Sequence, residues 1–381
     1  PPASFVDPGA GARSGGHGIQ VLGVDDGVIQ DNLIGFAGYN TIELEDNAQS
    51  WDILRNEIRS SGLSVGSGAE RQGGIYIDGD SSGSVIQGNL IADAAADALE
   101  NWEGPGGFTV AHNTIENTGQ RGVENMAIRV FGTGTVIENN VFDGGSGPAI
   151  IVVGANSSAP WPAATGNRLS QNEFRNNAGN SIDLMAASTV VSEYDDGDGI
   201  TVNDAASPGT SGNTGIDYPT ITSALDGGAS TTVAGTTCAS CRVEIYEALA
   251  GVGDTLSGTD YGEGDRYLGF ATANGSGNWS FVDATIGTGD VISTIVIDAA
   301  NNTSEFSPNA MVAAAATVDF SGKVFEDIAG DVLNDGAING ANNPGVGNVT
   351  VRLYQDGGDG VPNGVDDGAP IATTTTDATP G

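Results

Sequence analysis

A six-residue pattern recurs along the first half of the chain and limits the possible folds more than any other feature. The pattern is apolar-x-x-Asn-x-apolar. Its six copies are IQDNLI from Ile29, ILRNEI from Ile53, IQGNLI from Ile86, VAHNTI from Val110, IENNVF from Ile137 and LSQNEF from Leu169. A repeating unit of 24 to 33 residues cannot bury its own apolar face, so successive units are expected to stack.

A second short strand precedes each copy of the pattern, with alternating apolar and polar residues. These strands are GIQVLG from Gly18, TIELE from Thr41, GGIYID from Gly73, AIRVF from Ala127, AIIVV from Ala149 and SIDLM from Ser181. Alternation with a period of two is typical of half-buried β-strands, and Gly and Asn between strands suit tight corners. Coils stacked about 4.8 Å apart form a parallel β-helix. We predict a right-handed one over roughly residues 10–190, within a first domain of residues 1–192.

The asparagine of the pattern has a structural explanation. The aligned residues are Asn32, Asn56, Asn89, Asn113, Asn140 and Asn172. In stacked coils their side-chain amides can hydrogen-bond along the column and satisfy backbone groups at a bend. Because every coil carries one, we predict a structural ladder rather than a catalytic group.

These coils resemble the pectin-lyase-like superfamily, and in particular its right-handed β-helix repeat proteins, whose relatives bind or cleave polysaccharides. The resemblance covers about half of the chain and implies the fold. It leaves the function open, because the superfamily contains both enzymes and inert stalks. Gly16-His17-Gly18 resembles a polygalacturonase motif, but that family's Arg-Ile-Lys motif is absent. We therefore interpret His17 as a surface residue.

Alternation on the first strand of each coil predicts an exposed set of polar side chains. Glu43, Asp78, Glu100 and Arg129 would stack on neighbouring coils, with Tyr76, Trp102 and Glu45 beside them. Such a set suits a calcium-assisted polysaccharide lyase or a sugar-binding groove. The first four are candidate catalytic residues and the other three are candidate ligand-binding residues. The alternative is a solvated face, because 49 acidic residues create columns of carboxylates by chance.

The charge balance restricts the partners. The chain carries 49 acidic and 12 basic residues, a formal net charge of -37. A polyphosphate would be repelled, so we expect no nucleic-acid partner. Self-repulsion of this size calls for salt or bound cations, which predicts a secreted or cell-surface setting. No apolar run approaches ~18 residues, so we expect no membrane span.

Residues 193–217 form an acidic linker that is predicted to bind calcium. The candidate ligands are Asp195, Asp196, Asp198 and Asp204, with Glu193 and Asn203 nearby. Carboxylate and amide oxygens at alternate positions in a glycine-bent loop suit Ca²⁺, although the spacing is not that of an EF-hand. A plain solvated linker is the alternative.

Residues 218–316 show short strands at regular spacing, which is typical of a β-sandwich. The segments GSGNWSF and IDAANNTSEFS resemble bacterial immunoglobulin-like modules, which implies an Ig-like sandwich with Trp279 in its core or at a strand edge. Cys238 and Cys241 precede a strand. An extracellular setting favours a short-loop disulfide between them. Zinc binding needs further ligands, and a thioredoxin-like role needs a βαβ context.

Residues 317–381 resemble the start of a B-type calcium-binding domain from serine-aspartate-repeat adhesins. The resemblance rests on Val324-Phe325, an Asp-rich loop, Gly345-Val346 and the later Thr-rich strand. It implies a partial second sandwich with calcium ligands. These would be Glu326, Asp327, Asp331, Asn334, Asp335 and Asn339, with Asp356, Asp359 and Asp366 as a second group.

The sequence therefore predicts an all-β chain whose parallel β-helix precedes an Ig-like β-sandwich and a partial second one. Our first functional hypothesis is a secreted or cell-surface adhesin or scaffold. Its β-helix would bind a polysaccharide or a surface protein, and Ca²⁺ would stiffen a stalk. The second is a polysaccharide lyase or glycoside hydrolase on the β-helix. The third is a self-assembling extracellular filament, suggested by open coil ends and an incomplete last module. Catalysis stays open, with binding favoured.

Overall fold

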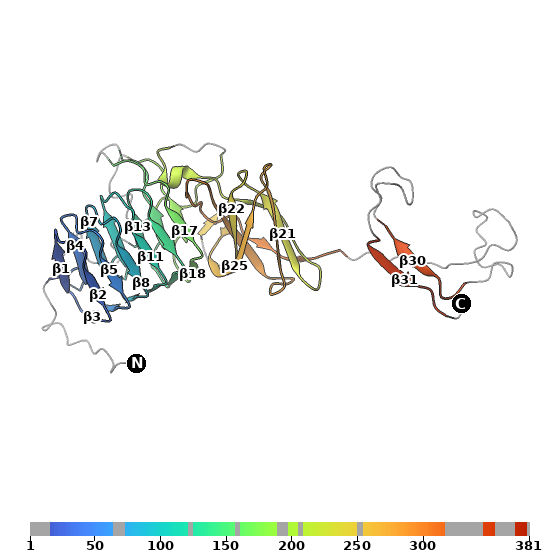
Figure 1. Ribbon diagram of the computed structural model, residues 1–381, viewed down its shortest axis with the longest axis horizontal. Coiled ribbons are helices and arrows are strands. Elements are labelled where there is room, and N and C mark those ends of the chain that lie inside the picture. The colour runs from blue at the N-terminus through green and yellow to red at the C-terminus, as the bar shows by residue number, and fades with distance from the viewer. Residues whose placement is uncertain are drawn as a thin grey trace. The chain divides into compact units, whose positions relative to one another are not determined.

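The computed structural model describes residues 16–63, 73–120, 125–156, 161–188, 197–204, 209–249, 254–316, 346–354 and 370–378. The chain divides into two compact units, Pro1–Ala315 and Ala316–Gly381. Each unit is described by itself. Apart from one 3-10 turn, η2 (Gly212–Gly215), all regular elements of the described residues are β-strands (Figure 1). The all-β prediction is confirmed.

Three parallel sheets form a solenoid, because the chain visits them in turn once per coil. The seven-stranded sheet contains β1 (Ile19–Leu22), β4 (Ile42–Glu45), β7 (Ile75–Asp78), β10 (Leu99–Trp102), β13 (Ile128–Val130), β16 (Ile150–Val152) and β19 (Ile182–Leu184). The second sheet contains β2 (Val28–Gln30), β5 (Asp52–Leu54), β8 (Val85–Gln87), β11 (Thr109–Ala111), β14 (Val136–Glu138) and β17 (Arg168–Ser170). The third contains β3 (Leu33–Gly35), β6 (Glu57–Arg59), β9 (Leu90–Ala92), β12 (Thr114–Glu116), β15 (Val141–Asp143) and β18 (Glu173–Arg175).

One dry interior runs through the solenoid. The first apolar residue of the repeated pattern stacks in register in the second sheet, through Ile29, Ile53, Ile86, Val110, Ile137 and Leu169. All six belong to a single buried core. Full burial of an isoleucine is worth about 1.5–3 kcal/mol, so this stack is a main source of stability. The predicted parallel β-helix is confirmed.

The asparagine ladder is also present. Asn56 Nδ2 donates to Asn89 Oδ1 at 3.0 Å and to the carbonyl oxygen of Ile29 at 2.9 Å. The Asn56 backbone N–H donates to the same Asn89 oxygen at 2.8 Å. Asn89, Asn113 and Asn140 repeat this arrangement. The ladder therefore satisfies backbone groups that the bend removes from the sheets.

The corner beside the ladder requires a left-handed backbone. The residue before each asparagine has a positive φ, for example 52° at Arg55, 55° at His112 and 56° at Gln171. Residues other than glycine adopt this conformation at a cost of about 1–2 kcal/mol, which the amide hydrogen bonds offset. His112 is therefore a corner residue of the solenoid.

Two four-stranded sheets follow the last coil and share one core; we call residues 220–314 the cap. The first sheet contains β26 (Asn278–Asp283), β21 (Thr231–Thr236), β20 (Thr220–Asp226) and β29 (Ala313–Ala314). The second contains β25 (Gly264–Thr272), β22 (Arg242–Ala248), β27 (Val291–Ile297) and β28 (Ala310–Met311). All pairings are antiparallel except that of β20 with β29. Trp279 lies in the shared core, and β23 (Asp254–Leu256) and β24 (Thr259–Tyr261) form a hairpin.

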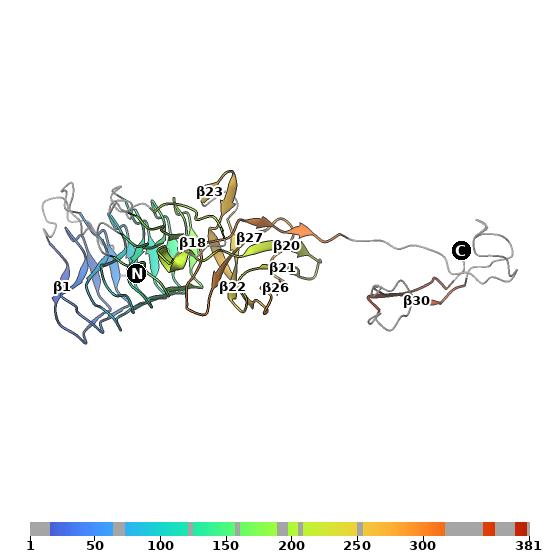
Figure 2. The same cartoon turned by 90° about the horizontal axis from the view of Figure 1, so that it is seen from above.

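The cap closes the end of the solenoid (Figure 2). Three glutamates accept hydrogen bonds from backbone N–H groups of the last coil. Glu244 accepts from Gln171 at 2.8 Å, Glu263 from Asn177 at 2.6 Å and Glu305 from Leu184 at 2.9 Å. Tyr246, Ile295 and Phe306 of the cap extend the solenoid core. Side-chain carboxylates therefore take the place of the carbonyl groups that a further coil would supply.

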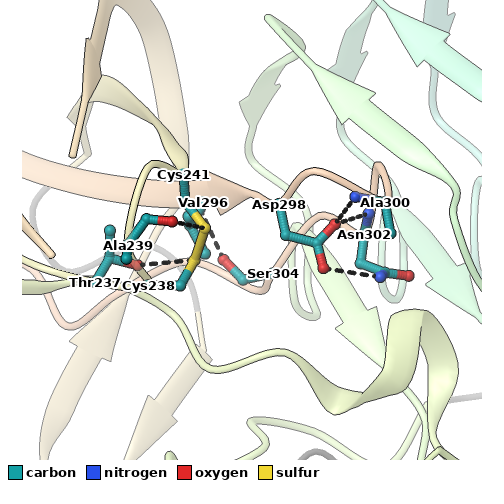
Figure 3. The surroundings of a disulfide bond; sticks show 9 residues. All are labelled: Thr237, Cys238, Ala239, Cys241, Val296, Asp298, Ala300, Asn302 and Ser304. Atoms are coloured by element: carbon teal, nitrogen blue, oxygen red, sulfur yellow. Dashed lines mark hydrogen bonds between the residues drawn. A yellow bond between two sulfur atoms is a disulfide. The ribbon is translucent and has the colours of Figure 1, made fainter. Parts of the chain in front are cut away.

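A turn of the cap makes a similar contact (Figure 3). Asp298 accepts hydrogen bonds from the backbone N–H groups of Ala300 and Asn302, both at 2.8 Å. Asn302 is thereby held so that its Oδ1 accepts from the Gly166 N–H at 2.7 Å. The predicted disulfide between Cys238 and Cys241 is present before β22, with the two Cα atoms 5.5 Å apart.

The second unit contains one described hairpin, β30 (Thr350–Leu353) with β31 (Ala372–Thr375). The predicted calcium ligands of this region lie outside the described residues. They are Glu326, Asp327, Asp331, Asn334, Asp335, Asn339, Asp356, Asp359 and Asp366. The partial second sandwich therefore stays a prediction.

Candidate functional site

The outer face of the seven-stranded sheet carries two adjacent rows of side chains, set by the strand register. The first row runs through Gln20, Glu43, Tyr76, Glu100, Arg129, Ile151 and Asp183. The second row contains Leu22 paired with Glu45, and Asp78 paired with Trp102. Both rows lie on the outer face because Ile42, Leu44, Ile75 and Ile77 alternate with them and point into the core.

The register corrects the predicted stack. Glu43, Glu100 and Arg129 share a row as expected, but the residue between them is Tyr76. Asp78 lies two positions further along β7, so it belongs to the second row beside Trp102. Alternation identifies the outward-facing residues, but only the strand register decides which of them are neighbours.

The first row is buried from Glu43 onward, so the prediction that it is exposed is wrong for four residues. Glu43, Tyr76, Glu100 and Arg129 are 0%, 4%, 4% and 1% exposed. Arg129 Nη1 lies 3.0 Å from Glu100 Oε1. A buried ion pair depends on both partners, because removing one leaves an uncompensated charge. The pair therefore acts as a rigid support beneath the second row.

His17 contacts the beginning of the first row and is not simply a surface residue. Its Nδ1 lies 2.8 Å from Glu43 Oε2, and its ring stacks on Tyr39 with centroids 5.5 Å apart. Gln20 Nε2 donates to the same Glu43 oxygen at 3.1 Å. The side chain of His17 is 19% exposed. His17 is therefore a half-buried residue with fixed partners rather than a freely exposed surface residue.

The second row offers half-buried side chains. Glu45, Asp78 and Trp102 are all partly exposed. The Arg129 guanidinium carbon lies 5.8 Å from the centre of the Trp102 ring. Trp102 also packs edge-on against Phe131 and Trp161, with centroids 5.6 and 5.3 Å apart. Neighbouring side chains thus fix the indole ring.

An apolar cluster continues the outer face beyond Trp102. It consists of Met126, Phe131, Ile151, Val153 and Met185, with Trp102 and Trp161 packed against it. The prediction of alternation in AIIVV is therefore wrong, because Ile150 to Val153 are all buried. A continuous apolar run is the signal of a strand covered on both faces, and it could have revealed this cluster in the sequence.

The acidic loop is described only in part. Asp195, Asp196 and Glu193 lie outside the described residues. Asp198 Oδ2 accepts a hydrogen bond from the Ala186 N–H at 2.9 Å, and Asn203 exchanges two hydrogen bonds with the backbone of Tyr218. The Asp204 N–H donates to Asp217 Oδ1 at 3.3 Å. No group of three or more His, Cys, Asp or Glu among the described residues is arranged to hold a metal ion, and calcium stays a prediction.

Two buried acids beside this loop were not predicted as site residues. Burial, followed by the charges of Glu305 and Asp198, raises the pKa of Asp183 well above its usual value. The pKa of Glu305 is raised to about 8, mainly by burial and to a smaller extent by the Asp198 charge, while hydrogen bonds from Leu184 and Thr201 oppose the change. The alternation in SIDLM signals that Asp183 faces outward. The residue Glu305 lies 122 positions later, and no local pattern joins the two.

Comparison with known proteins adds little beyond the fold. No curated protein matches the chain. The enzymatically active domain of bacteriophage CBA120 tailspike protein 2 is 12% identical with a TM-score of 0.29, over 74% of this chain and 48% of that one. The catalytic domain of a GH87 alpha-1,3-glucanase in complex with tetrasaccharides is 11% identical with a TM-score of 0.27, over 44% of this chain and 47% of that one. The Dettilon tailspike protein is 11% identical with a TM-score of 0.31, over 77% of this chain and 68% of that one.

The chain thus spans about half the length of the first two of these structures. Similarity this low transfers no activity. Within the described ranges, no helix has the length and apolar character of a membrane span. Residues 11–160 match the model of the protein family described as right handed beta helix region. The three parallel sheets agree with this match.

Proposed function

We propose that the outer face of the seven-stranded sheet binds a glycan chain, with Trp102 as the stacking platform. The observation that carries the proposal is the setting of Trp102. It is a half-buried indole held by Arg129, Phe131 and Trp161, beside the half-buried Asp78. Aromatic rings pack on apolar faces, while neighbouring polar groups supply hydrogen bonds that fix orientation.

The buried first row supports this role through rigidity. Glu100 and Arg129 are fixed by their ion pair, so Trp102 needs little ordering when a ligand arrives. Binding sites that are already ordered lose less conformational entropy on association. Asp78 on the adjacent strand β7 and Glu45 one strand further along would then contact hydroxyl groups on one side of the platform.

The test is a binding titration of the full chain against a panel of neutral and acidic oligosaccharides. Trp102→Ala should weaken binding of the selected glycan by about tenfold or more, the usual effect of removing an aromatic anchor. Trp51→Phe is the control, because the half-buried Trp51 lies directly before β5, away from the seven-stranded sheet, and its Nε1 donates to the carbonyl oxygen of Val24. Binding that is unchanged in Trp102→Ala would refute the proposed face.

Glycoside hydrolysis is the second candidate, favoured by one feature of the second row. Glu45 and Asp78 directly follow the paired residues Leu44 and Ile77 on adjacent strands. Adjacent strands lie about 4.8 Å apart, close to the carboxylate separation of about 5 Å in retaining glycosidases. The buried Glu43 and Glu100 are less suited to contact a substrate.

The same glycan panel distinguishes hydrolysis from binding alone. If Glu45 and Asp78 are the catalytic pair, the chain should release shorter oligosaccharides, and Asp78→Asn should stop this release while binding persists. Binding without any shortened product would leave the face a recognition surface. A secreted adhesin or scaffold, a calcium-stiffened stalk and filament assembly stay proposals that rest on the sequence.

A further inference from the structure

Three acidic side chains meet where the last coil joins the cap, away from Trp102. Asp183 lies on β19, Asp198 on the loop after the last coil and Glu305 beyond β27. Asp183 and Glu305 are 1% and 3% exposed, whereas Asp198 is exposed. The charged groups that act on Asp183 are the other two acids. The joint therefore gathers negative charge in a place with little water to screen it.

The hydrogen bonds of this cluster are incomplete at one atom. Glu305 Oε1 and Oε2 accept from the Leu184 and Thr201 N–H groups at 2.9 and 2.8 Å. Asp183 Oδ2 accepts from the Gly199 N–H at 3.0 Å. Asp183 Oδ1 is buried and has no hydrogen-bond partner among the residues that the structure describes. Gly199 directly follows Asp198 in the chain, so its bond to Asp183 brings the two acids together, and the Asp198 charge acts on Asp183.

Two carboxylates close together at a poorly hydrated joint are unfavourable unless a cation or a proton lies between them. We propose that Asp183 and Asp198 together bind a calcium ion at this joint. Calcium is coordinated by carboxylate oxygens, and backbone carbonyl oxygens and water molecules complete its coordination shell. The exposed Asp198 gives the ion a path from solvent, and the buried Asp183 supplies the oxygen that lacks a partner.

Glu305 contributes charge to this site rather than a ligand, because both of its oxygens are occupied by backbone N–H groups. This agrees with the lack of a three-residue metal arrangement within the described ranges. The proposal also differs from the predicted loop site, because it requires Asp183 of the last coil. A bound ion would tie the loop of residues 197–204 to the solenoid.

The experiment measures calcium binding and thermal unfolding on the full chain. Isothermal titration should show one calcium ion fewer for Asp183→Asn and for Asp198→Asn than for the wild-type chain. Calcium at about 100 times its dissociation constant should raise the Tm of the wild type by about 5 °C. Both variants should lose that rise, and without calcium neither should melt below the wild type, because the repulsion is gone.

Asp204→Asn is the matched control, because it removes a carboxylate of the predicted loop site but leaves Asp183 and Asp198 intact. It should keep the full stoichiometry and the full rise in Tm. Sodium chloride at matched ionic strength controls for screening. Asp198→Asn decides the outcome if Asp183→Asn does not fold, because Asp198 is exposed.

Two results would overturn the proposal. If Asp183→Asn and Asp198→Asn retain the wild-type stoichiometry, any calcium binds elsewhere in the chain. If calcium has no effect but acidification from pH 8 to pH 5 stabilises the wild type and not the variants, the two carboxyl groups share a proton instead.

Discussion

At the scale of single residues, the side-chain amides of the ladder stabilise the solenoid through hydrogen bonds that no other group replaces. Asn89 Oδ1 accepts from both the backbone and the side chain of Asn56, and its Nδ2 donates to Ile53 and Asn113. The side chain is 2% exposed. Truncation would therefore leave several buried polar groups without partners.

We expect Asn89→Ala to lower the free energy of unfolding by about 3 kcal/mol, from at least two buried groups left unsatisfied. Denaturant titration followed by circular dichroism measures this loss. Asn32→Ala is the control, because Asn32 lies in the first coil and is exposed, and its cost should be much smaller. Equal losses in the two variants would contradict the ladder as the source of the effect.

At the scale of elements, the carboxylates that join the cap to the last coil make its stability depend on pH. Glu263 accepts from the Asn177 N–H at 2.6 Å, and burial raises its pKa despite this hydrogen bond. In the unfolded chain the same group titrates near its ordinary value of about 4.3. The folded protein thus binds more protons in the interval between the two values, and stability falls as pH rises through it.

Glu263→Gln should remove this part of the pH dependence and keep the hydrogen bond, because the glutamine oxygen can still accept. At pH 8 the variant should be at least as stable as the wild type, and near pH 4 the two should converge. Thermal melts at several pH values test this. Glu247→Gln is the control, because Glu247 is partly exposed and pairs with Arg266. A Glu263→Gln variant that is less stable than the wild type at pH 8 would contradict Glu263 as the source of this pH dependence.

The sequence predicts elements far better than it predicts contacts between them. The period-two strands and the asparagine pattern identify the coils, because both arise from local geometry. The row shared by Glu43, Tyr76 and Glu100 depends on register, which unequal coil lengths of 24 to 33 residues conceal. In the sequence, nothing distinguishes Glu244 from other acidic residues of strands, or Glu305 from other acidic residues of loops. Their role at the last coil arises from contacts across more than 70 residues.

At the scale of the whole molecule, the solenoid and the cap form one compact unit. Phe306 of the cap is 3% exposed and lies 5.7 Å from Phe174 and 5.2 Å from Tyr246, measured between ring centroids. A core shared in this way predicts that residues 16–315 unfold together.

Tryptophan fluorescence and circular dichroism should therefore report the same transition for this unit in urea. Phe306→Ala should lower the stability by about 3–5 kcal/mol and shift both signals equally. Val282→Ala is the control, because Val282 is 60% exposed and should change stability by less than about 0.5 kcal/mol. Separate transitions, or a shift in one signal alone, would show that the cap and the solenoid unfold independently.

The glutamate contacts at the last coil have a consequence for how such a chain can change in evolution. Glu244, Glu263 and Glu305 recognise backbone N–H groups, which every coil of the solenoid presents in the same way. Duplication or deletion of a whole coil further upstream would leave these glutamate contacts at the last coil unaltered. The length of the outer face of the seven-stranded sheet can therefore vary in whole repeats, while a single closing domain serves every variant.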